Sequence, residues 1–117
     1  MAVAGPAPAD YLPLTPALFH VLLSLADGQK HGYAILKEIS ERTDGRVELS
    51  TGTLYGIIKR LLADGLITDS AAGSDERRRA YRLTPFGRKV MAAEAERLED
   101  LVATARLKRV IPELRKA

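Results

Sequence analysis

Residues 50–65 read STGTLYGIIKRLLADG, a stretch in which both ends of a helix are marked. Ser50 is a good N-cap, because its hydroxyl can accept a hydrogen bond from a free backbone N–H of the first turn. Gly65 can adopt the left-handed conformation that closes a helix. Apolar residues recur at helical spacing and predict one buried face, formed by Leu54, Ile57, Ile58, Leu61 and Leu62.

The opposite face of this predicted helix is polar and basic and contains two glycines. It carries Thr51, Gly52, Tyr55, Gly56, Lys59 and Arg60. A glycine in a helix interior costs about 1 kcal/mol relative to alanine, so Gly56 in the middle of the helix requires an explanation. Close approach of another surface is one, and the adjacent positive charges favour an acidic partner. We therefore hypothesise that this face enters the major groove of DNA.

Length and composition restrict the class of protein. The 117 residues allow one domain with appendages. A net charge of +3 permits an acidic partner without indicating one, so the clustering of charge has to decide. The absence of cysteine excludes disulfides, thiolate metal sites and cysteine nucleophiles. No apolar run approaches the roughly 18 residues that span a membrane, and the proline-broken N-terminus is unlike a signal peptide. We therefore expect a cytoplasmic protein without a membrane partner.

Two helices are predicted ahead of residue 50. Residues 1–13 are rich in alanine and proline, and we interpret them as a flexible arm. Thr15 and Pro16 supply the N-cap and first position of a helix, and a second helix is expected over residues 33–42. Tyr33 in its first turn has two interpretations, a half-buried packing residue, which we prefer, or a phosphate contact through the phenol. Residues 47–49 alternate apolar and polar and are compatible with a short strand.

A hairpin is predicted after residue 65. Residues 66–70 and 77–83 have strand-like patterns, and the turn between them contains Gly73, Ser74 and Asp75. Its return strand is basic, with Arg77, Arg78, Arg79 and Arg82. A run of charge is usually only a solvated face. Here it follows directly on the basic face of residues 50–65, which favours a DNA-binding wing.

Thr84 and Pro85 open the longest predicted helix, which extends to about residue 109 and is roughly 37 Å long. An apolar seam follows it at helical spacing: Met91, Ala95, Leu98, Leu101, Val102 and Ala105. A domain of about 70 residues is too small to cover such a helix, and an exposed apolar seam indicates a partner. We expect a homodimer through this helix. The alternative is that the helix folds back on the first helix of its own chain.

The motifs that resemble a known family are His31-Gly32-Tyr33, Gly52-Thr53-Leu54-Tyr55 with Lys59-Arg60-Leu61, and Tyr81-Arg82-Leu83-Thr84. Over about residues 14–105 the chain resembles the PadR family of bacterial transcriptional regulators, in the short form with a single C-terminal helix. The resemblance implies a winged helix-turn-helix, dimerisation through the last helix, and usually repression. Thr51 and Gly56 stand where members often have proline. Some members hold aromatic effectors beside a tryptophan, which this chain lacks, so any effector is unknown.

The sequence thus predicts a mainly α fold with a small β-hairpin. Residues 14–84 would form the winged helix-turn-helix, residues 85–111 the dimerisation helix, and residues 112–117 a frayed tail. We expect a homodimeric repressor on a palindromic operator, with two recognition helices in successive major grooves roughly 34 Å apart. The predicted DNA contacts are Tyr33, Ser50, Thr51, Thr53, Tyr55, Lys59, Arg60, Arg77, Arg78 and Arg79. Of these, Thr51, Thr53 and Tyr55 are the candidates for bases, and the basic residues are the candidates for phosphates.

Two other functional classes compete with DNA binding. A winged-helix module for protein or RNA binding is the alternative, against which the basic helix and wing argue. An enzyme is not expected, because His20 and His31 lie on different elements without a carboxylate pair. The sequence also lacks a glycine-rich phosphate loop and the HExxH and CxxC motifs, so no cofactor and no metal site is predicted.

Overall fold

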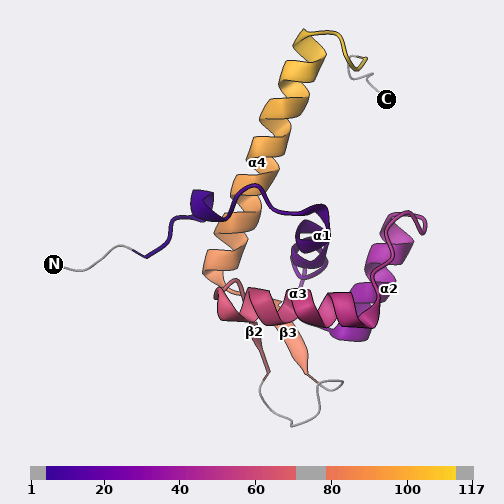
Figure 1. Cartoon of the computed structure of the whole chain (residues 1–117), viewed down its shortest axis with the longest axis vertical. Coiled ribbons are helices and arrows are strands. Elements are labelled where there is room, and N and C mark those ends of the chain that lie inside the picture. Colours follow the sequence, from indigo (N-terminus) through magenta and orange to yellow (C-terminus); the bar gives the residue numbers. More distant parts are fainter. Residues whose placement is uncertain (1–4, 71–78, 113–117) are drawn as a thin grey trace, which may run out of the picture.

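The computed structural model describes residues 5–70 and 79–112. Its elements are a 3₁₀ helix η1 (Pro8–Tyr11), helix α1 (Pro16–Ser24), strand β1 (Lys30–His31), helices α2 (Gly32–Arg42) and α3 (Thr51–Ala63), strands β2 (Ile67–Asp69) and β3 (Ala80–Leu83), and helix α4 (Pro85–Leu107). Helices α1 to α3 pack together, the hairpin projects beyond α3, and α4 extends away from the domain (Figure 1). The predicted mainly α winged helix-turn-helix with a long last helix is confirmed.

The starts of three helices follow from the caps seen in the sequence. Thr15 accepts a hydrogen bond from the backbone N–H of Leu18, and Ser50 accepts one from Thr53. Thr84 does the same for Gly87. Each cap satisfies one of the backbone donors that a helix start leaves free, which fixes where the chain turns into the helix. Gly65 has a φ of 74°, so it ends α3 in the left-handed conformation as expected.

The wing is part of a three-stranded antiparallel sheet in the order β1-β3-β2. Ile67 pairs with Leu83 and Asp69 with Tyr81, while Lys30 on the other side also pairs with Tyr81. The strand suggested for residues 47–49 is wrong, since these residues are irregular. The third strand is β1, which no sequence pattern predicted. Two residues are too few to show a strand period, and the partner of β1 lies about fifty residues away.

The core is aliphatic and is built from one face of each helix. Its largest fully buried side chain is Tyr81, surrounded by leucine, isoleucine and valine from α1, α2, α3 and α4. The predicted buried face of α3 is confirmed for Leu54, Ile57, Ile58 and Leu61, and Leu62 packs at the edge. Removal of this apolar surface from water is the main stabilising contribution to the fold.

A polar network joins α1 to α2. Arg42 donates to Glu38 at 2.6 Å, to the carbonyl of His20 at 3.2 Å and to the ring Nδ1 of His20 at 3.1 Å. Lys30 donates to the carbonyl of Ser24 at 2.5 Å and contacts Glu38 at 3.3 Å. Burial, and then the Arg42 charge, lower the pKa of His20 below its ordinary value. The hydrogen bond from Arg42 to the ring therefore suits a neutral His20. The network holds α2 in position against α1.

The N-terminal segment differs from the unstructured arm expected there. Residues 8–11 form η1, and the ring of Tyr11 meets the ring of Phe86 edge-on at a centroid distance of 5.6 Å. The backbone N–H of Leu14 donates to Oε2 of Glu94 at 2.8 Å. Glu94 is only 2% exposed and also accepts from Arg97 at 2.5 Å. A buried carboxylate is retained because it is paired and hydrogen-bonded, and here it anchors the segment that leads into α1.

Helix α4 begins in direct contact with the end of α3. The backbone N–H of Thr84 donates to the carbonyl of Leu66 at 3.0 Å, and its hydroxyl donates to the carbonyl of Gly65 at 2.6 Å. A Cβ atom built on Gly87 would lie 1.9 Å from the same Leu66 carbonyl oxygen. Only glycine therefore fits at residue 87, since any side chain would separate α4 from the hairpin.

We predict that Gly87→Ala lowers the free energy of unfolding by about 3 kcal/mol or more, because the added methyl must displace backbone. Urea denaturation followed by circular dichroism measures this change. Gly56→Ala is the matched control, since a Cβ at residue 56 meets no atom within 4 Å. Equal stability of the two variants would show that the contact with Leu66 is not tight.

We predict that Glu94 makes the protein sensitive to acid. The hydrogen bonds from Arg97 hold the pKa of Glu94 below its ordinary value of 4.5, although burial acts in the opposite direction. A carboxyl with a lowered folded-state pKa stabilises the fold at pH values above 4.5, and this contribution is lost as the pH falls through the lowered value.

Glu94→Gln should therefore cost about 1 kcal/mol at pH 7 and should flatten the loss of stability below pH 4.5. Urea midpoints measured from pH 7 to pH 3 test both effects. Glu96→Gln, at an exposed position on the same helix, should change neither. An acid profile of Glu94→Gln that overlays the wild type would remove Glu94 from this role.

Candidate nucleic-acid interface

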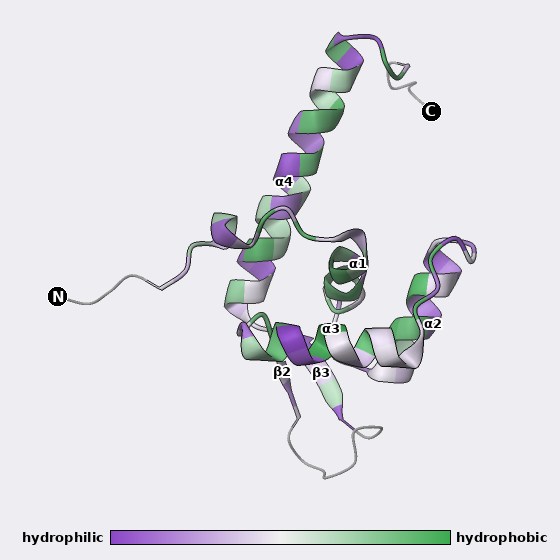
Figure 2. Ribbon diagram, viewed as in Figure 1, coloured by the Kyte–Doolittle hydropathy of each residue, from purple (hydrophilic) through white to green (hydrophobic). Residues whose placement is uncertain are grey.

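The face of α3 that points away from the core is open to solvent. Thr51, Gly52, Thr53, Gly56, Lys59 and Arg60 are all exposed on it. The hydropathy colouring places the most hydrophilic part of α3 toward its C-terminal end and a nearly neutral surface toward its start (Figure 2). The exposed face therefore presents small and hydroxyl-bearing residues first and positive charge after them.

At the start of α3, Ser50 and Thr53 form a closed pair. The Ser50 hydroxyl accepts from the backbone N–H of Thr53 at 3.1 Å and donates to the Thr53 hydroxyl at 2.9 Å. The capping role predicted for Ser50 is thus present. Because the Thr53 oxygen accepts this bond, its own hydroxyl proton can be donated outward. Thr53 is therefore better placed than Ser50 to read a hydrogen-bond acceptor beyond the protein.

Tyr55 serves packing between two helices. It is half-buried, and a Cβ built on Gly32 would lie 2.7 Å from the Tyr55 hydroxyl oxygen. Gly32 thus lets the tyrosine ring cross the start of α2, and this close approach explains why glycine stands there. Of the three residues proposed for base contact, Tyr55 is the one that the structure turns toward its own chain.

Tyr33 is the aromatic residue that faces outward. It lies in the first turn of α2 and is 75% exposed, so the preferred half-buried packing role is wrong. The physical reason is that the buried face of α2 is completed by Gly32, Ile35 and Ile39, which leaves Tyr33 on the other side. Its phenol is free to contact a phosphate, as the second interpretation supposed.

The glycines of α3 are not required by a close contact with any other described residue. A Cβ built on Gly52 or Gly56 meets no heavy atom within 4 Å, in contrast to Gly32 and Gly87. Neither residue has the positive φ that favours glycine. The cost of Gly56 in the helix interior is therefore not offset by an internal contact.

The two basic residues of α3 differ in their pairing. The Arg60 guanidinium lies 3.8 Å from the Asp64 carboxylate, and both groups retain contact with solvent. An exposed pair of this kind contributes little to stability and is easily exchanged for another anion. Lys59 makes no ion pair with any residue in the described ranges. Both cations are accordingly available to an acidic partner.

The base of the wing is partly held by internal contacts. Arg79 lies 3.6 Å from Asp69 across the hairpin, and its carbonyl is 3.1 Å from Nδ1 of His31. Arg82 on β3 is exposed. Arg77 and Arg78 lie outside the described residues. His31 was not among the predicted site residues, and its place in the His31-Gly32-Tyr33 motif was the only signal that could have marked it.

The seam of α4 is divided between two environments. Met91 is buried in the core of its own chain, and Ala95 is half-buried. Farther along, Leu98 and Val102 are exposed, Leu101 is 55% exposed, and Ala105 is half-buried. This part of α4 extends beyond the other elements (Figure 1). The fold-back alternative therefore holds only for the first turns of α4 and leaves the second half without a packing partner among the described residues.

Two other kinds of function find no support in the described residues. They contain no group of three or more histidine, cysteine, aspartate or glutamate side chains that could hold a metal ion. Within the same ranges, none of the helices is long and apolar enough to cross a bilayer.

Comparison with known proteins places the chain in a family. Residues 21–93 match the Transcriptional regulator PadR-like family. The transcriptional regulator Rv3488 of Mycobacterium tuberculosis is 39% identical over 83 residues, which cover 70% of this chain and 75% of that protein.

Solved structures share this fold. A transcriptional regulator from Clostridium thermocellum has a TM-score of 0.66 at 28% identity, over 88% of this chain and 94% of that one. Lactococcus lactis ZitR, solved in complex with DNA, shares the fold with a TM-score of 0.59 at 24% identity, over 91% of this chain and 66% of that one. The winged fold, the exposed basic face of α3 and the match over residues 21–93 together show that this chain is a DNA-binding transcriptional regulator of the PadR-like family.

Proposed function

We propose that this regulator is a homodimeric repressor that binds a palindromic operator. The observation that carries the proposal is the exposed face of α3, where Gly56 has open space around it and Lys59 has no ion pair among the described residues. A helix with this face fits the major groove, because the groove admits a helix and the phosphates on its two edges attract the cations. The family assignment argues against the alternative, a winged-helix module that binds protein or RNA.

Contacts with bases are assigned to the first turns of α3. The exposed hydroxyls of Thr51 and Thr53 can bond base edges, whereas Lys59 and Arg60 lie nearer the helix end and are assigned to phosphates. Tyr33 adds a phosphate contact from α2. Arg77, Arg78 and Arg79 are retained as wing contacts, with Arg79 exchanging Asp69 for phosphate. Tyr55 is half-buried and packs against Gly32, so it would hold α3 in position and would not contact a base. Ser50 would act as the N-cap of α3.

Dimerisation is assigned to α4. Leu98, Leu101 and Val102 form an exposed apolar strip on the part of the helix that leaves the domain. Exposed apolar strips of this kind are usually covered by a partner, and two copies of one strip pair naturally about a two-fold axis. The two-fold axis would place one α3 in each of two successive major grooves and would require a palindromic site. Repression would follow if that site overlaps the region where transcription starts, and a protein that binds such a site would act in the cytoplasm.

The proposal is tested by selecting bound sequences from a random DNA library with the purified full-length protein. We expect a palindrome whose half-sites are centred about 10 base pairs apart, or a multiple of that spacing. The affinity for the selected site should fall steeply with salt, by nearly one unit of logarithmic slope for each phosphate contact. Recovery of a single unrepeated site would contradict the dimer, and recovery of no enriched site would contradict operator binding.

We predict opposite effects of Gly56→Ala on stability and on DNA binding. The free energy of unfolding should rise by about 1 kcal/mol, because alanine favours the helix and its methyl group meets no atom. The affinity for the selected operator should fall about tenfold, equivalent to about 1.4 kcal/mol, because the methyl separates the helix from the groove. Urea denaturation and fluorescence anisotropy measure the two. A variant that is more stable and binds unchanged would show that Gly56 is not a point of close approach.

We predict that Leu101→Asp converts the dimer to a monomer, because the charge would be buried at the centre of the strip without a partner. Sedimentation velocity over a range of protein concentrations measures the association. Ala103→Asp is the matched control, since Ala103 is also exposed on α4 but lies outside the seam. Association of Leu101→Asp at the wild-type concentration would exclude this strip as the interface.

A further inference from the structure

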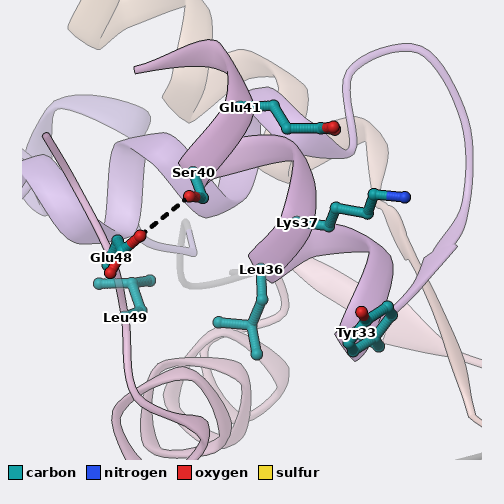
Figure 3. A pocket seen from close by; sticks show the side chains of 7 residues that line it. All are labelled: Tyr33, Leu36, Lys37, Ser40, Glu41, Glu48 and Leu49. Atoms are coloured by element: carbon teal, nitrogen blue, oxygen red, sulfur yellow. Dashed lines mark hydrogen bonds between the residues drawn. The ribbon is translucent and has the colours of Figure 1, made fainter. Parts of the chain in front are cut away.

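A cavity of about 290 Å³ lies between α2 and the irregular segment that leads into α3 (Figure 3). Leu49, the residue directly before the Ser50 cap, forms part of its wall. None of the residues assigned to base contact lines it, and Tyr33 is the only assigned DNA contact that does. The cavity is therefore separate from the groove-facing surface of α3.

The inner part of this cavity is apolar. Leu36 of α2 and Leu49 are half-buried, and both pack against the hydrophobic core. Tyr33, a residue that is 75% exposed, stands on one side (Figure 3). A wall of this kind offers two aliphatic surfaces and one aromatic face to the body of a small molecule. Most binding sites for small molecules combine such apolar walls with a few fixed polar groups.

The fixed polar group here is the Glu48 carboxylate. The Ser40 hydroxyl donates to its Oε1 at 3.2 Å, which orients the carboxylate and leaves Oε2 available. Among the described residues, neither Glu48 nor Glu41 forms an ion pair. Lys37 is the only basic residue in the lining, and its side chain runs beside Glu41 along the outer edge, away from Glu48 (Figure 3). Two acids and one base give the lining a net negative charge.

We propose that this cavity binds a small organic cation, a protonated amine carried on a compact apolar or aromatic body. The ammonium would be accepted by Glu48, and the body would extend past Leu36 toward the Tyr33 ring, which lies at the opposite end of the lining (Figure 3). The body would rest on Leu36 and Leu49. A volume of about 290 Å³ is at the lower end for ligand sites and suits a single ring. The site goes beyond the proposed DNA binding, and its test requires no DNA.

The test is a titration of the full-length ¹⁵N-labelled protein with 2-phenylethylamine, followed by amide chemical shifts. Shifts are expected at Leu36, Ser40, Glu48 and Leu49, with a Kd of about 1 mM, the range for a ligand of this size in an open site. Two compounds with the same ring are the matched controls. The neutral 2-phenylethanol and the anionic 3-phenylpropanoate should bind about fivefold more weakly, since they lack the cation that Glu48 would accept.

Two variants separate recognition of charge from apolar contact. Glu48→Gln keeps an acceptor for Ser40 and should weaken amine binding about fivefold. Tyr33→Leu keeps apolar bulk but removes the ring on which the aromatic body would stack, and it should weaken amine binding about threefold. Glu96→Gln, an exposed acid on α4, should bind as the wild type does. Equal binding of amine and alcohol, unchanged binding in Glu48→Gln, or shifts confined to other residues would each overturn the proposal, as would no shift at about 20 mM amine.

Discussion

The contact between Gly87 and the Leu66 carbonyl determines how the parts of this molecule are oriented. Leu66 follows directly on Gly65, which ends α3, while Gly87 belongs to the first turn of α4. The Thr84 hydroxyl lies within hydrogen-bond distance of the Gly65 and Leu66 carbonyl oxygens. It also caps α4 by accepting a hydrogen bond from the backbone N–H of Gly87. The end of α3 and the beginning of α4 therefore meet at one joint that is formed by backbone atoms and by Thr84. The direction in which α4 leaves the domain is set by backbone atoms, which cannot repack as side chains can.

This joint explains why α4 has two halves of different character. The first turns lie against the core, where Val90 and Met91 are buried, and Glu94 then holds the N-terminal segment through the Leu14 amide. Beyond Glu94 no residue of α4 is fully buried within the described part of the chain, although α4 runs on to Leu107. Under the proposed dimerisation, the spacing of the two α3 helices would follow from the joint at Gly87 and from the length of the exposed half. A change at residue 87 would then affect DNA binding without touching the DNA.

The sequence was most informative where structure depends on neighbouring residues. The caps at Thr15, Ser50 and Thr84, and the apolar face of α3, follow from hydrogen bonds and periodicities that span only a few positions. These local signals were enough to predict the order of the helices and the hairpin of the wing, and this order identifies the fold. They also located the exposed basic face of α3 correctly.

The features that the sequence did not reveal depend on contacts between distant residues. The partner of Glu94 is 80 positions away, so no pattern in the residues around Glu94 indicates that its side chain is buried. The half-burial of Tyr55 depends on Gly32, and the outward position of Tyr33 depends on which side of α2 is needed for the core. Periodicity shows that a helix has two faces, but it does not show which aromatic ring a neighbouring helix will accept.

The composition of the exposed α3 face has a consequence for how an operator would be recognised. Gly52 and Gly56 provide no side chain, and Tyr55 is held by its own chain, so few groups remain that can distinguish one base pair from another. Thr51 and Thr53 are short and have single hydroxyls, which select less strongly than the bidentate groups of arginine or asparagine. Much of the affinity would then come from phosphates and much of the specificity from DNA shape at close approach. On this reasoning the two glycines are functional features of the proposed interface: a bare helix surface follows the groove, and the cations at its end hold it there.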